Sequence, residues 1–253
     1  MGAHYLHQLF APESVAVIGA TTREDSVGHR VFANMIEAGF KGELYAVNPK
    51  YQEIQGRPCF PSIEAIGKPV DVVVVVTPAA TVPGLIREAG ENGVRGAVVI
   101  SAGFREVGPK GVRLEEEMLD AARHHGVRII GPNCLGTMRP SVGLNATFSH
   151  NAALPGSMAL ISQSGALCSS VLDWALANQV GFSSMVSMGG SAVVDFGEAL
   201  DYLASDGETK SILLYIEGIR NARRFMSGLR VAARMKPVVV VKAGRHAAGS
   251  TAA

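Results

Sequence analysis

Charged residues are scarce in this sequence, and their signs are nearly balanced. They make up 18% of the 253 residues, against about 25% in an average protein, and 23 basic side chains face 22 acidic ones. A protein dedicated to duplex nucleic acid carries a strongly basic surface, so a net charge of +1 disfavours that class. Aromatic residues are also few, at 6% with a single Trp, which leaves little material for stacking bases. We therefore expect no nucleic-acid partner.

Long apolar runs and metal-type cysteine spacings are missing as well. No apolar stretch approaches the roughly 20 residues that a helix needs to cross a bilayer, and the opening MGAHYLHQLFAPES lacks the basic start and apolar core of a signal peptide. The three cysteines, Cys59, Cys134 and Cys168, are odd in number. We interpret them as reduced thiols and expect no metal site. These observations predict a cytoplasmic protein without a membrane partner.

Apolar residues, by contrast, are plentiful and regularly arranged. They make up 47% of a chain long enough for one large domain or two ordinary ones. Short β-branched runs alternate with segments of helical period, and five consecutive valines at 72–76 are typical of a parallel strand buried on both faces. This alternation predicts a doubly wound α/β sheet with right-handed crossovers. Its strands are expected at residues 15–18, 44–47, 70–76, 97–100 and 127–130.

The periodicity is lost over residues 134–156, which are rich in Gly, Pro, Asn and Ser, and then a second β-α series begins. We therefore place a Rossmann-like domain at 1–140, a linker at 141–156 and a second α/β domain at 157–253. The last predicted strand has no helix after it to cover its face, which predicts that the second domain is incomplete or is completed by another chain. Strands of this series are expected at 158–162, 183–188, 212–216 and 238–241.

The first strand–turn–helix is the default phosphate site of such a sheet. The strand ends at Gly19-Ala20-Thr21, and the helix begins at Ser26-Val27-Gly28, where the first N–H groups have no helical partner. The spacing differs from G-x-G-x-x-G, and the place where NAD-binding folds carry Asp or Glu reads Asn48-Pro49-Lys50. A lysine there favours a phosphate-bearing ligand over NAD. The alternative is an ordinary turn beside a solvated lysine.

Further strand ends of this series should meet at the same edge of the sheet, where ligands bind. They are Thr77-Pro78-Ala79, Ser101-Ala102-Gly103 and Asn133. Gly103 would let the backbone approach a ligand closely. Turn chemistry alone also explains each of them.

The second series offers an anion site of its own. Ser162-Gln163-Ser164-Gly165 joins a strand to a helix, where Ser164 can cap the helix and the N–H groups can hold an anion. Gly189-Gly190 could form the opposite lip of this site. Glu217 ends a strand and should point into the same crevice. A plain capped helix and a solvated glutamate are the alternatives.

Together these motifs resemble one known family. The segments VAVIGAT, AVNPKY, VVTPAAT, AVVISAGF, RIIGPNCLG, GLNATF, ALISQSGAL, DWALANQVGFS and LLYIEGI are similar, in this order, to the α-type part of NDP-forming acyl-CoA synthetases. The sequence resembles the succinyl-CoA synthetase α subunit more distantly, and also the synthetase-like part of bacterial protein lysine acetyltransferases. The resemblance implies a CoA-binding domain followed by a flavodoxin-like CoA-ligase domain, both with parallel sheets.

The resemblance also implies a reaction, acyl-CoA + phosphate + NDP = acid + CoA + NTP, with a phosphohistidine intermediate. It implies that CoA is a substrate and that Mg and the nucleotide are held by an ATP-grasp domain or a β subunit. In this pattern Gly19, Ala20, Thr21, Ser26, Val27 and Gly28 hold the CoA phosphates, and Asn48, Pro49 and Lys50 lie near its nucleotide. Thr77, Pro78, Ala79, Ser101, Ala102 and Gly103 line the pantetheine path, and Asn133 approaches the thiol. Ser162, Gln163, Ser164, Gly165, Gly189 and Gly190 match the phosphate site, and Glu217 matches the glutamate that orients the phosphohistidine.

The family's phosphohistidine has no counterpart within this chain. It follows a segment like the one from Lys242 to Ala253, and His246 comes too early for it. The resemblance thus implies a truncated or excised α-type part that binds CoA without turnover. The alternative is a CoA- or acyl-CoA-sensing module of a larger regulatory acyltransferase with degenerate ligase chemistry. The acyl group, the choice of ADP or GDP and the oligomeric state stay open.

Overall fold

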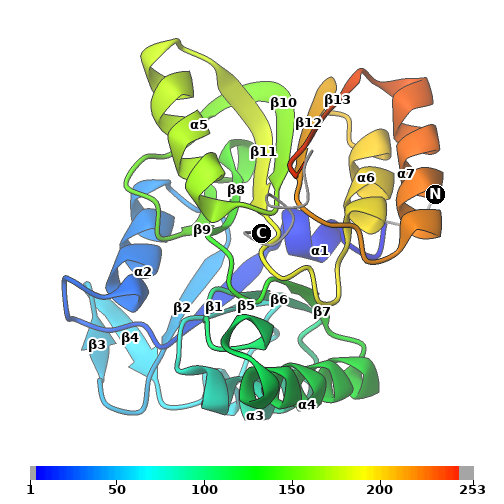
Figure 1. Cartoon of the computed structure of the whole chain (residues 1–253). Helices are drawn as coiled ribbons and strands as arrows, with labels where there is room; N and C mark the ends of the chain where they lie inside the picture. Colours follow the sequence, from blue (N-terminus) through cyan, green and yellow to red (C-terminus); the bar gives the residue numbers. More distant parts are fainter. Residues whose placement is uncertain (1–3, 245–253) are drawn as a thin grey trace.

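Two mostly parallel β-sheets organise the chain, for which a computed structural model describes residues 4–244 (Figure 1). The first sheet has the order β3-β4-β2-β1-β5-β6-β7, in which only the pairing of β3 with β4 is antiparallel. The five strands predicted for this sheet are confirmed within one or two residues. The strands are β1 (Ser14–Ile18), β2 (Glu43–Val47), β3 (Glu53–Ile54), β4 (Arg57–Phe60), β5 (Val72–Val75), β6 (Gly96–Val99) and β7 (Arg128–Ile130).

Helices cover both faces of this first sheet. α2 (Val27–Glu37) packs on one face, and α3 (Val82–Glu91) and α4 (Pro109–His125) lie side by side on the other (Figure 1). α2 begins where predicted because the Ser26 hydroxyl accepts a hydrogen bond from the His29 N–H, and α4 ends at Gly126, whose φ of 70° is readily adopted by glycine. Within residues 4–244, no helix is both long and apolar enough to cross a membrane.

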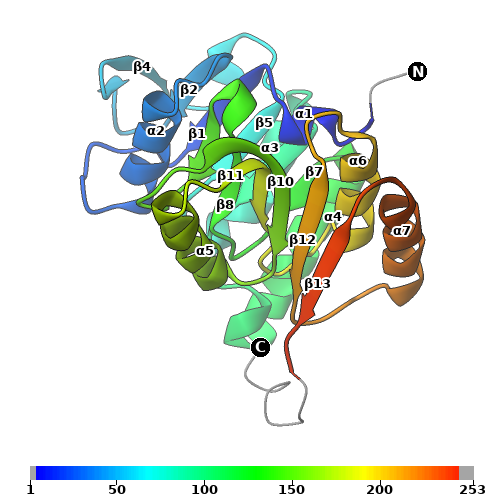
Figure 2. The same cartoon turned by 90° about the horizontal axis from the view of Figure 1, so that it is seen from above.

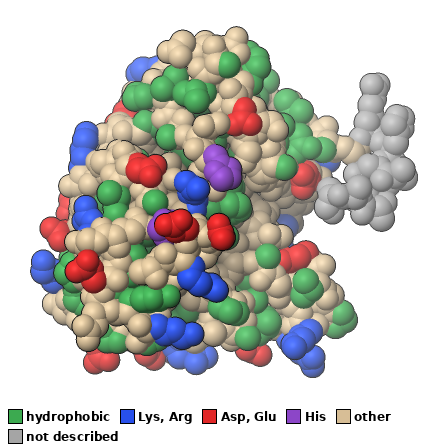
Figure 3. Space-filling model, turned by 90° about the vertical axis from the view of Figure 1, so that its left-hand side faces the viewer, with side chains coloured by type: hydrophobic (Ala, Val, Ile, Leu, Met, Phe, Trp, Pro, Cys, Tyr) green, Lys and Arg blue, Asp and Glu red, His purple; other side chains and the backbone are tan. Residues whose placement is uncertain are grey.

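The second sheet has the order β13-β12-β10-β11-β8-β9, with α5 (Gly165–Ala177) on one face and α6 (Phe196–Ser205) and α7 (Ala222–Met235) on the other (Figure 2). β13 is an edge strand and leaves valines 239–241 exposed. α5 is apolar on its outer side too, and Figure 3 shows hydrophobic side chains gathered at the top of the molecule, where α5 lies. The strands are β8 (Gly136–Arg139), β9 (Leu144–Thr147), β10 (Leu154–Ser162), β11 (Gly181–Ser187), β12 (Ser211–Ile216) and β13 (Val238–Lys242).

The segment predicted as a linker, 141–156, contains β9 and the start of β10. β8 and β9 form a hairpin, β8 pairs antiparallel with β11, and β10 already begins at Leu154. Every residue of both hairpin strands is buried, polar ones included, so no alternation of apolar and polar residues marks them in the sequence. The second sheet therefore begins at Gly136, within the range predicted for the first domain, and both sheets are mixed rather than purely parallel.

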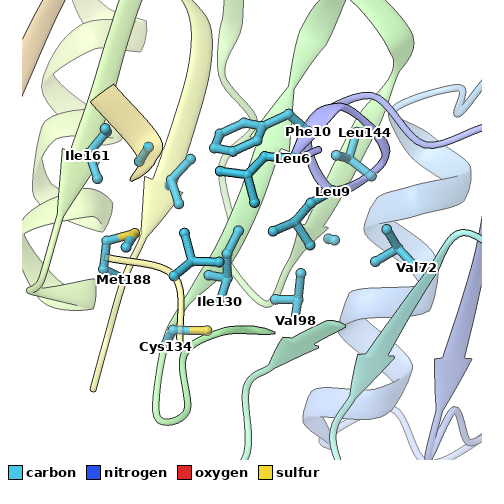
Figure 4. Close-up of a cluster of buried hydrophobic side chains, with 14 of the residues drawn as sticks. Leu6, Leu9, Phe10, Val72, Val98, Ile130, Cys134, Leu144, Ile161 and Met188 are labelled. Carbon is cyan, nitrogen blue, oxygen red and sulfur yellow. The ribbon is translucent and has the colours of Figure 1, made fainter. Parts of the chain in front are cut away.

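A shared hydrophobic core joins the two sheets. Leu6 and the short helix α1 (His7–Phe10) place apolar side chains beside Ile130 of the first sheet and Ile161 of the second (Figure 4). Met188, which follows β11, belongs to the same buried cluster. Residues of α6 do so as well, so both units contribute to this cluster. This arrangement fixes the carboxyl ends of both sheets relative to each other.

One buried ion pair fastens the hairpin to α6. The Arg139 guanidinium donates to the Asp206 carboxylate, with Nη2 2.8 Å from Oδ1, and both side chains are less than one-tenth exposed. Burial acts to raise the pKa of Asp206, but hydrogen bonds from Arg139 and Thr209 outweigh it and hold that pKa below its ordinary value of 3.8.

This shift predicts a pH-dependent stability. Because the pKa of Asp206 is lower in the folded than in the unfolded chain, the stabilisation it provides is complete above 3.8 and is lost as the pH falls through the folded-state pKa. Urea unfolding of Asp206→Asn and wild type, measured between about pH 7 and about pH 3, should show a stability deficit that shrinks with acidification. A deficit that is constant with pH would contradict the lowered pKa.

Candidate functional site

A cavity of about 670 Å³ opens where the carboxyl ends of the two sheets meet. From the first unit it is lined by residues that follow strands or begin α2, and from the second by the turn before α5 and the end of β12. Eight residues singled out in the sequence line it together: Val27, Ser101, Ala102, Asn133, Gln163, Ser164, Gly165 and Glu217. The structure thus brings the residues predicted for a CoA-type ligand and those predicted for an anion into one space.

The turn between β1 and α2 is tightly packed. Gly19 has a φ of +96°, and a Cβ on Gly28 would lie 2.1 Å from the Gly19 carbonyl oxygen. The Ala20 carbonyl accepts from Asn48 Nδ2 at 2.8 Å, and the Thr21 hydroxyl lies 3.0 Å from the Tyr51 hydroxyl. Of this turn only Val27 lines the cavity.

Asn48 ties the second strand end to the first. While its Nδ2 holds the Ala20 carbonyl, its Oδ1 accepts from the Lys50 N–H at 3.0 Å. Pro49 and Lys50 are exposed and lie outside the cavity lining. Tyr51, which the sequence reasoning missed, stands next to them, and hydrogen bonds with Thr21 and Thr22 lower the pKa of its hydroxyl. In the sequence, the signal that could have drawn attention to Tyr51 is an aromatic residue directly after Asn48-Pro49-Lys50.

The segments that follow β5, β6 and β7 are hydrogen-bonded to one another. The Ser101 hydroxyl donates to the Thr77 carbonyl at 2.6 Å, and the Asn133 N–H donates to the Ser101 carbonyl at 3.0 Å. Asn133 itself is exposed and has a φ of +54°, a conformation that asparagine tolerates well. Residues outside the lining are Thr77, Pro78, Ala79 and Gly103.

The turn before α5 presents hydrogen-bond donors to the cavity. The Ser162 hydroxyl accepts from the Ser164 N–H at 3.0 Å, and the Ser164 hydroxyl caps the helix by accepting from the Leu167 N–H at 3.2 Å. These two bonds leave the N–H groups of Gly165 and Ala166 at the helix start, and both residues line the cavity. Unpaired N–H groups at the positive end of a helix are a favourable place for an anion.

Glu217 is held at its backbone from two sides. Gln163 Oε1 accepts from the N–H groups of Glu217, at 2.6 Å, and of Gly218, at 2.9 Å. Lys242 Nζ donates to the Glu217 carbonyl at 2.9 Å. Gln163 was expected to bind phosphate, but its side-chain carbonyl oxygen positions the loop that carries Glu217. This loop places the half-buried Glu217 carboxylate in the cavity lining.

Gly189 and Gly190 lie beside the cavity rather than in its lining. A Cβ on Gly189 would lie 2.3 Å from the Asn133 carbonyl oxygen, and the Gly190 N–H donates to the Pro132 carbonyl at 2.8 Å. These glycines allow the loop after β11 to contact the loop that carries Asn133. They join the two units at the edge of the site.

Several lining residues escaped the sequence reasoning. Burial raises the pKa of the Cys134 thiol to about 12, so this group stays neutral. Phe148 follows β9, inside the segment interpreted as a linker, which is why it was overlooked. His246 lies outside the described residues. The lining residues missed are Val76, Ile100, Cys134, Leu135, Phe148, Ala166 and Ser169.

Comparison with protein families matches nearly the whole chain. Residues 13–140 match the family described as "CoA binding domain", and residues 155–253 match "Succinyl-CoA ligase like flavodoxin domain". An ADP-forming acetate–CoA ligase I of Archaeoglobus fulgidus is 47% identical over 98% of this chain and 36% of its own length. The α subunit of the ADP-forming acetate–CoA ligase I of Pyrococcus furiosus is 41% identical over 98% of this chain and 54% of its own. The chain thus spans about a third to about half of these relatives.

Solved structures agree with these matches. An acetyl-coenzyme A synthetase 1 of Ca. Korarchaeum cryptofilum, in complex with phosphate and ADP, superposes with a TM-score of 0.93 at 38% identity, covering 98% of this chain and 53% of that one. The ATP citrate lyase of Methanothrix soehngenii, at 19% identity and a TM-score of 0.73, shares the fold.

Proposed function

The chain belongs to the NDP-forming acyl-CoA synthetases, as their α-type region of a CoA-binding domain and a succinyl-CoA ligase-like flavodoxin domain, and we propose that it binds CoA and phosphate in the cavity between its two sheets. The observation that carries this proposal is the shared lining. Ser101, Ala102 and Asn133 come from the first unit, and Ser164 and Gly165 from the second. A thioester carbon and a phosphate oxygen can meet only where both sites open into one space.

In the proposed reaction, a phosphate held by the Gly165 and Ala166 N–H groups attacks the acyl carbon of acyl-CoA. The new O–C bond forms as the C–S bond breaks, and the thiolate takes up a proton to leave as CoA. The acyl phosphate then passes its phosphoryl group to a histidine, which releases the acid, and from there to NDP. The N–H groups stabilise charge on the phosphate throughout.

Glu217 acts on the histidine step in this scheme. A carboxylate that accepts a hydrogen bond from one ring nitrogen leaves the other free to attack phosphorus, and it balances the charge of the phosphohistidine. Its backbone is fixed by Gln163 and Lys242, so the carboxylate needs little reorganisation to do so. No histidine lines the cavity among the described residues. We assign Mg and the nucleotide to an ATP-grasp domain or a β subunit.

The acid is proposed to be a small monocarboxylate. The relatives with the higher identities are named acetate–CoA ligases. Two relatives of lower identity, at 33% and 31%, are named for 4-hydroxybutyrate and for trans-feruloyl-CoA. Glu217 is the one charged side chain in the cavity lining, so a second carboxylate on the acid would find no cation there among the described residues. The proposed location is the cytoplasm, which the three free cysteines support.

Replacing Lys50 with alanine should weaken CoA binding by about 1–2 kcal/mol, the scale of one charge-assisted hydrogen bond. Titration calorimetry with CoA and with dephospho-CoA measures it. Lys68→Ala is the matched control, because Lys68 is also exposed but precedes β5, at the opposite edge of the sheet. Equal affinity of Lys50→Ala and wild type for both ligands would remove Lys50 from the site.

Equilibrium dialysis against CoA and against NAD tests the proposed function as a whole. Binding of CoA with no binding of NAD is expected. Incubation of the full-length protein with γ-labelled NTP should then give an acid-labile phosphoprotein. CoA binding without any such label would instead indicate a sensing module, and binding of NAD would refute the proposal.

A further inference from the structure

We infer that Phe148 limits the length of the acyl group, an inference that rests on the proposed function. The residue is a large aromatic with 37% of its surface exposed, and it lines the same cavity as the anion-binding turn. Exposed aromatic rings lose the favourable burial that most of them obtain in a protein core. Because the Phe148 ring is only partly buried and lines the cavity, it is available to contact a ligand there.

The backbone around Phe148 is held firmly, so its exposure does not arise from a loose loop. Asn34, buried in α2, donates from Nδ2 to the carbonyl of Thr147 and to that of Ser149, both at 2.8 Å. The Ser149 N–H donates to the Thr147 hydroxyl at 3.2 Å. Both neighbours of Phe148 are themselves buried.

The hydrogen bonds that hold the two neighbours of Phe148 also connect the two units. Asn34 belongs to the first unit, whereas β9 belongs to the sheet of the second, and Figure 1 shows the two elements beside each other. A buried amide that satisfies two carbonyls leaves little freedom to the residue between them. Phe148 is thus positioned relative to both halves of the cavity at once.

We place the acyl group in the part of the cavity next to the turn before α5. In the proposed reaction its carbonyl carbon sits between the turn before α5 and the thiol of CoA, so the rest of the acyl group must occupy the space beside that turn. Leu135 abuts the turn, since a Cβ on Gly165 would lie 3.4 Å from the Leu135 Cβ. Leu135 and Ala166 lie at the turn, and Phe148 lines the same cavity. Phe148 is the bulkiest of the three and leaves least room for a long chain.

The test compares the binding of acetyl-CoA and hexanoyl-CoA to the full-length protein by titration calorimetry. Wild type should bind acetyl-CoA more tightly. Phe148→Ala should shift the ratio of the two dissociation constants toward hexanoyl-CoA by about tenfold or more, because one methylene group in an apolar pocket already changes discrimination by about tenfold. Phe148→Trp should shift it the opposite way. The ratio of the two dissociation constants cancels any effect of a substitution on the CoA moiety, which both ligands share.

Trp174→Ala is the matched control, because Trp174 is an exposed aromatic of α5 that does not line the cavity. It should leave the ratio unchanged. If Phe148→Ala binds CoA normally and the ratio equals that of wild type, the inference is overturned while the proposed function stands. If wild type fails to bind CoA at all, the proposed function falls, and this inference with it.

Discussion

Replacing Gly28 with alanine should weaken CoA binding by about tenfold or more, and should also lower the free energy of unfolding by about 1–3 kcal/mol. The added Cβ would lie 2.1 Å from the Gly19 carbonyl oxygen, which is a backbone atom that cannot move aside alone. The start of α2 would have to shift away from the end of β1. That shift displaces the N–H groups proposed to hold the CoA phosphates.

Gly84→Ala is the control for this experiment. Gly84 also lies in the first turns of a helix, α3, but a Cβ there meets nothing within 4 Å. The substitution should leave CoA binding unchanged and raise stability by up to about 1 kcal/mol, because alanine favours the helix over glycine. Calorimetric titration with CoA and urea unfolding distinguish the two variants. Wild-type CoA affinity in Gly28→Ala would show that the helix start takes no part in binding.

Replacing Arg139 with alanine should lower the free energy of unfolding by about 3–5 kcal/mol, the usual effect of removing one partner from a buried ion pair. The Arg139 side chain is 6% exposed, and its loss leaves the Asp206 carboxylate, 8% exposed, without its cation. The Ser184 hydroxyl loses a hydrogen bond as well. Urea denaturation measures the change.

Arg123→Ala serves as the comparison. Arg123 also pairs with an aspartate, Asp120, but the two side chains are 71% and 72% exposed on α4. An exposed pair of this kind contributes at most about 1 kcal/mol. The double variant Arg139→Leu with Asp206→Leu should recover part of the loss, because it removes both charges from the buried site. Equal destabilisation by Arg139→Ala and Arg123→Ala would mean that the buried pair adds nothing.

The proposed chemistry depends on how two units share one cavity. In the proposal, the first unit supplies the CoA site and the turn before α5 supplies the phosphate site. Gly189 and Gly190 bring the loop after β11 against the loop that carries Asn133, and the cluster around α1 holds the sheets together behind it. A substitution in these contacts should therefore slow the proposed reaction without touching a ligand, since misplacement by about 1 Å is enough to slow a reaction strongly.

Local chemistry in the sequence determined most secondary elements of this protein. Valines 72–75 form a strand buried on both faces, Ser26 and Ser164 cap the helices that they precede, and Gly126 ends α4. Each of these features depends on neighbours within a few residues, such as a hydroxyl that accepts an N–H from the next turn. The position of the predicted strand ends at the cavity could also be predicted, because parallel strands bring their carboxyl ends to one edge of the sheet.

Tertiary structure alone decided the hairpin of β8 and β9 and everything that depends on it. Arg139 and Thr147 are polar, yet they are buried because distant parts of the chain satisfy them. Ser184 and Asp206 accept hydrogen bonds from the Arg139 guanidinium, and Asn34 donates to the Thr147 carbonyl. The pattern of these hairpin residues therefore resembles a loop in the sequence. Phe148 follows this hairpin, and its place in the cavity depends on a hydrogen bond from Asn34 to a residue 113 positions away. Such partners meet only once both sheets have formed, so no local pattern in the sequence records them.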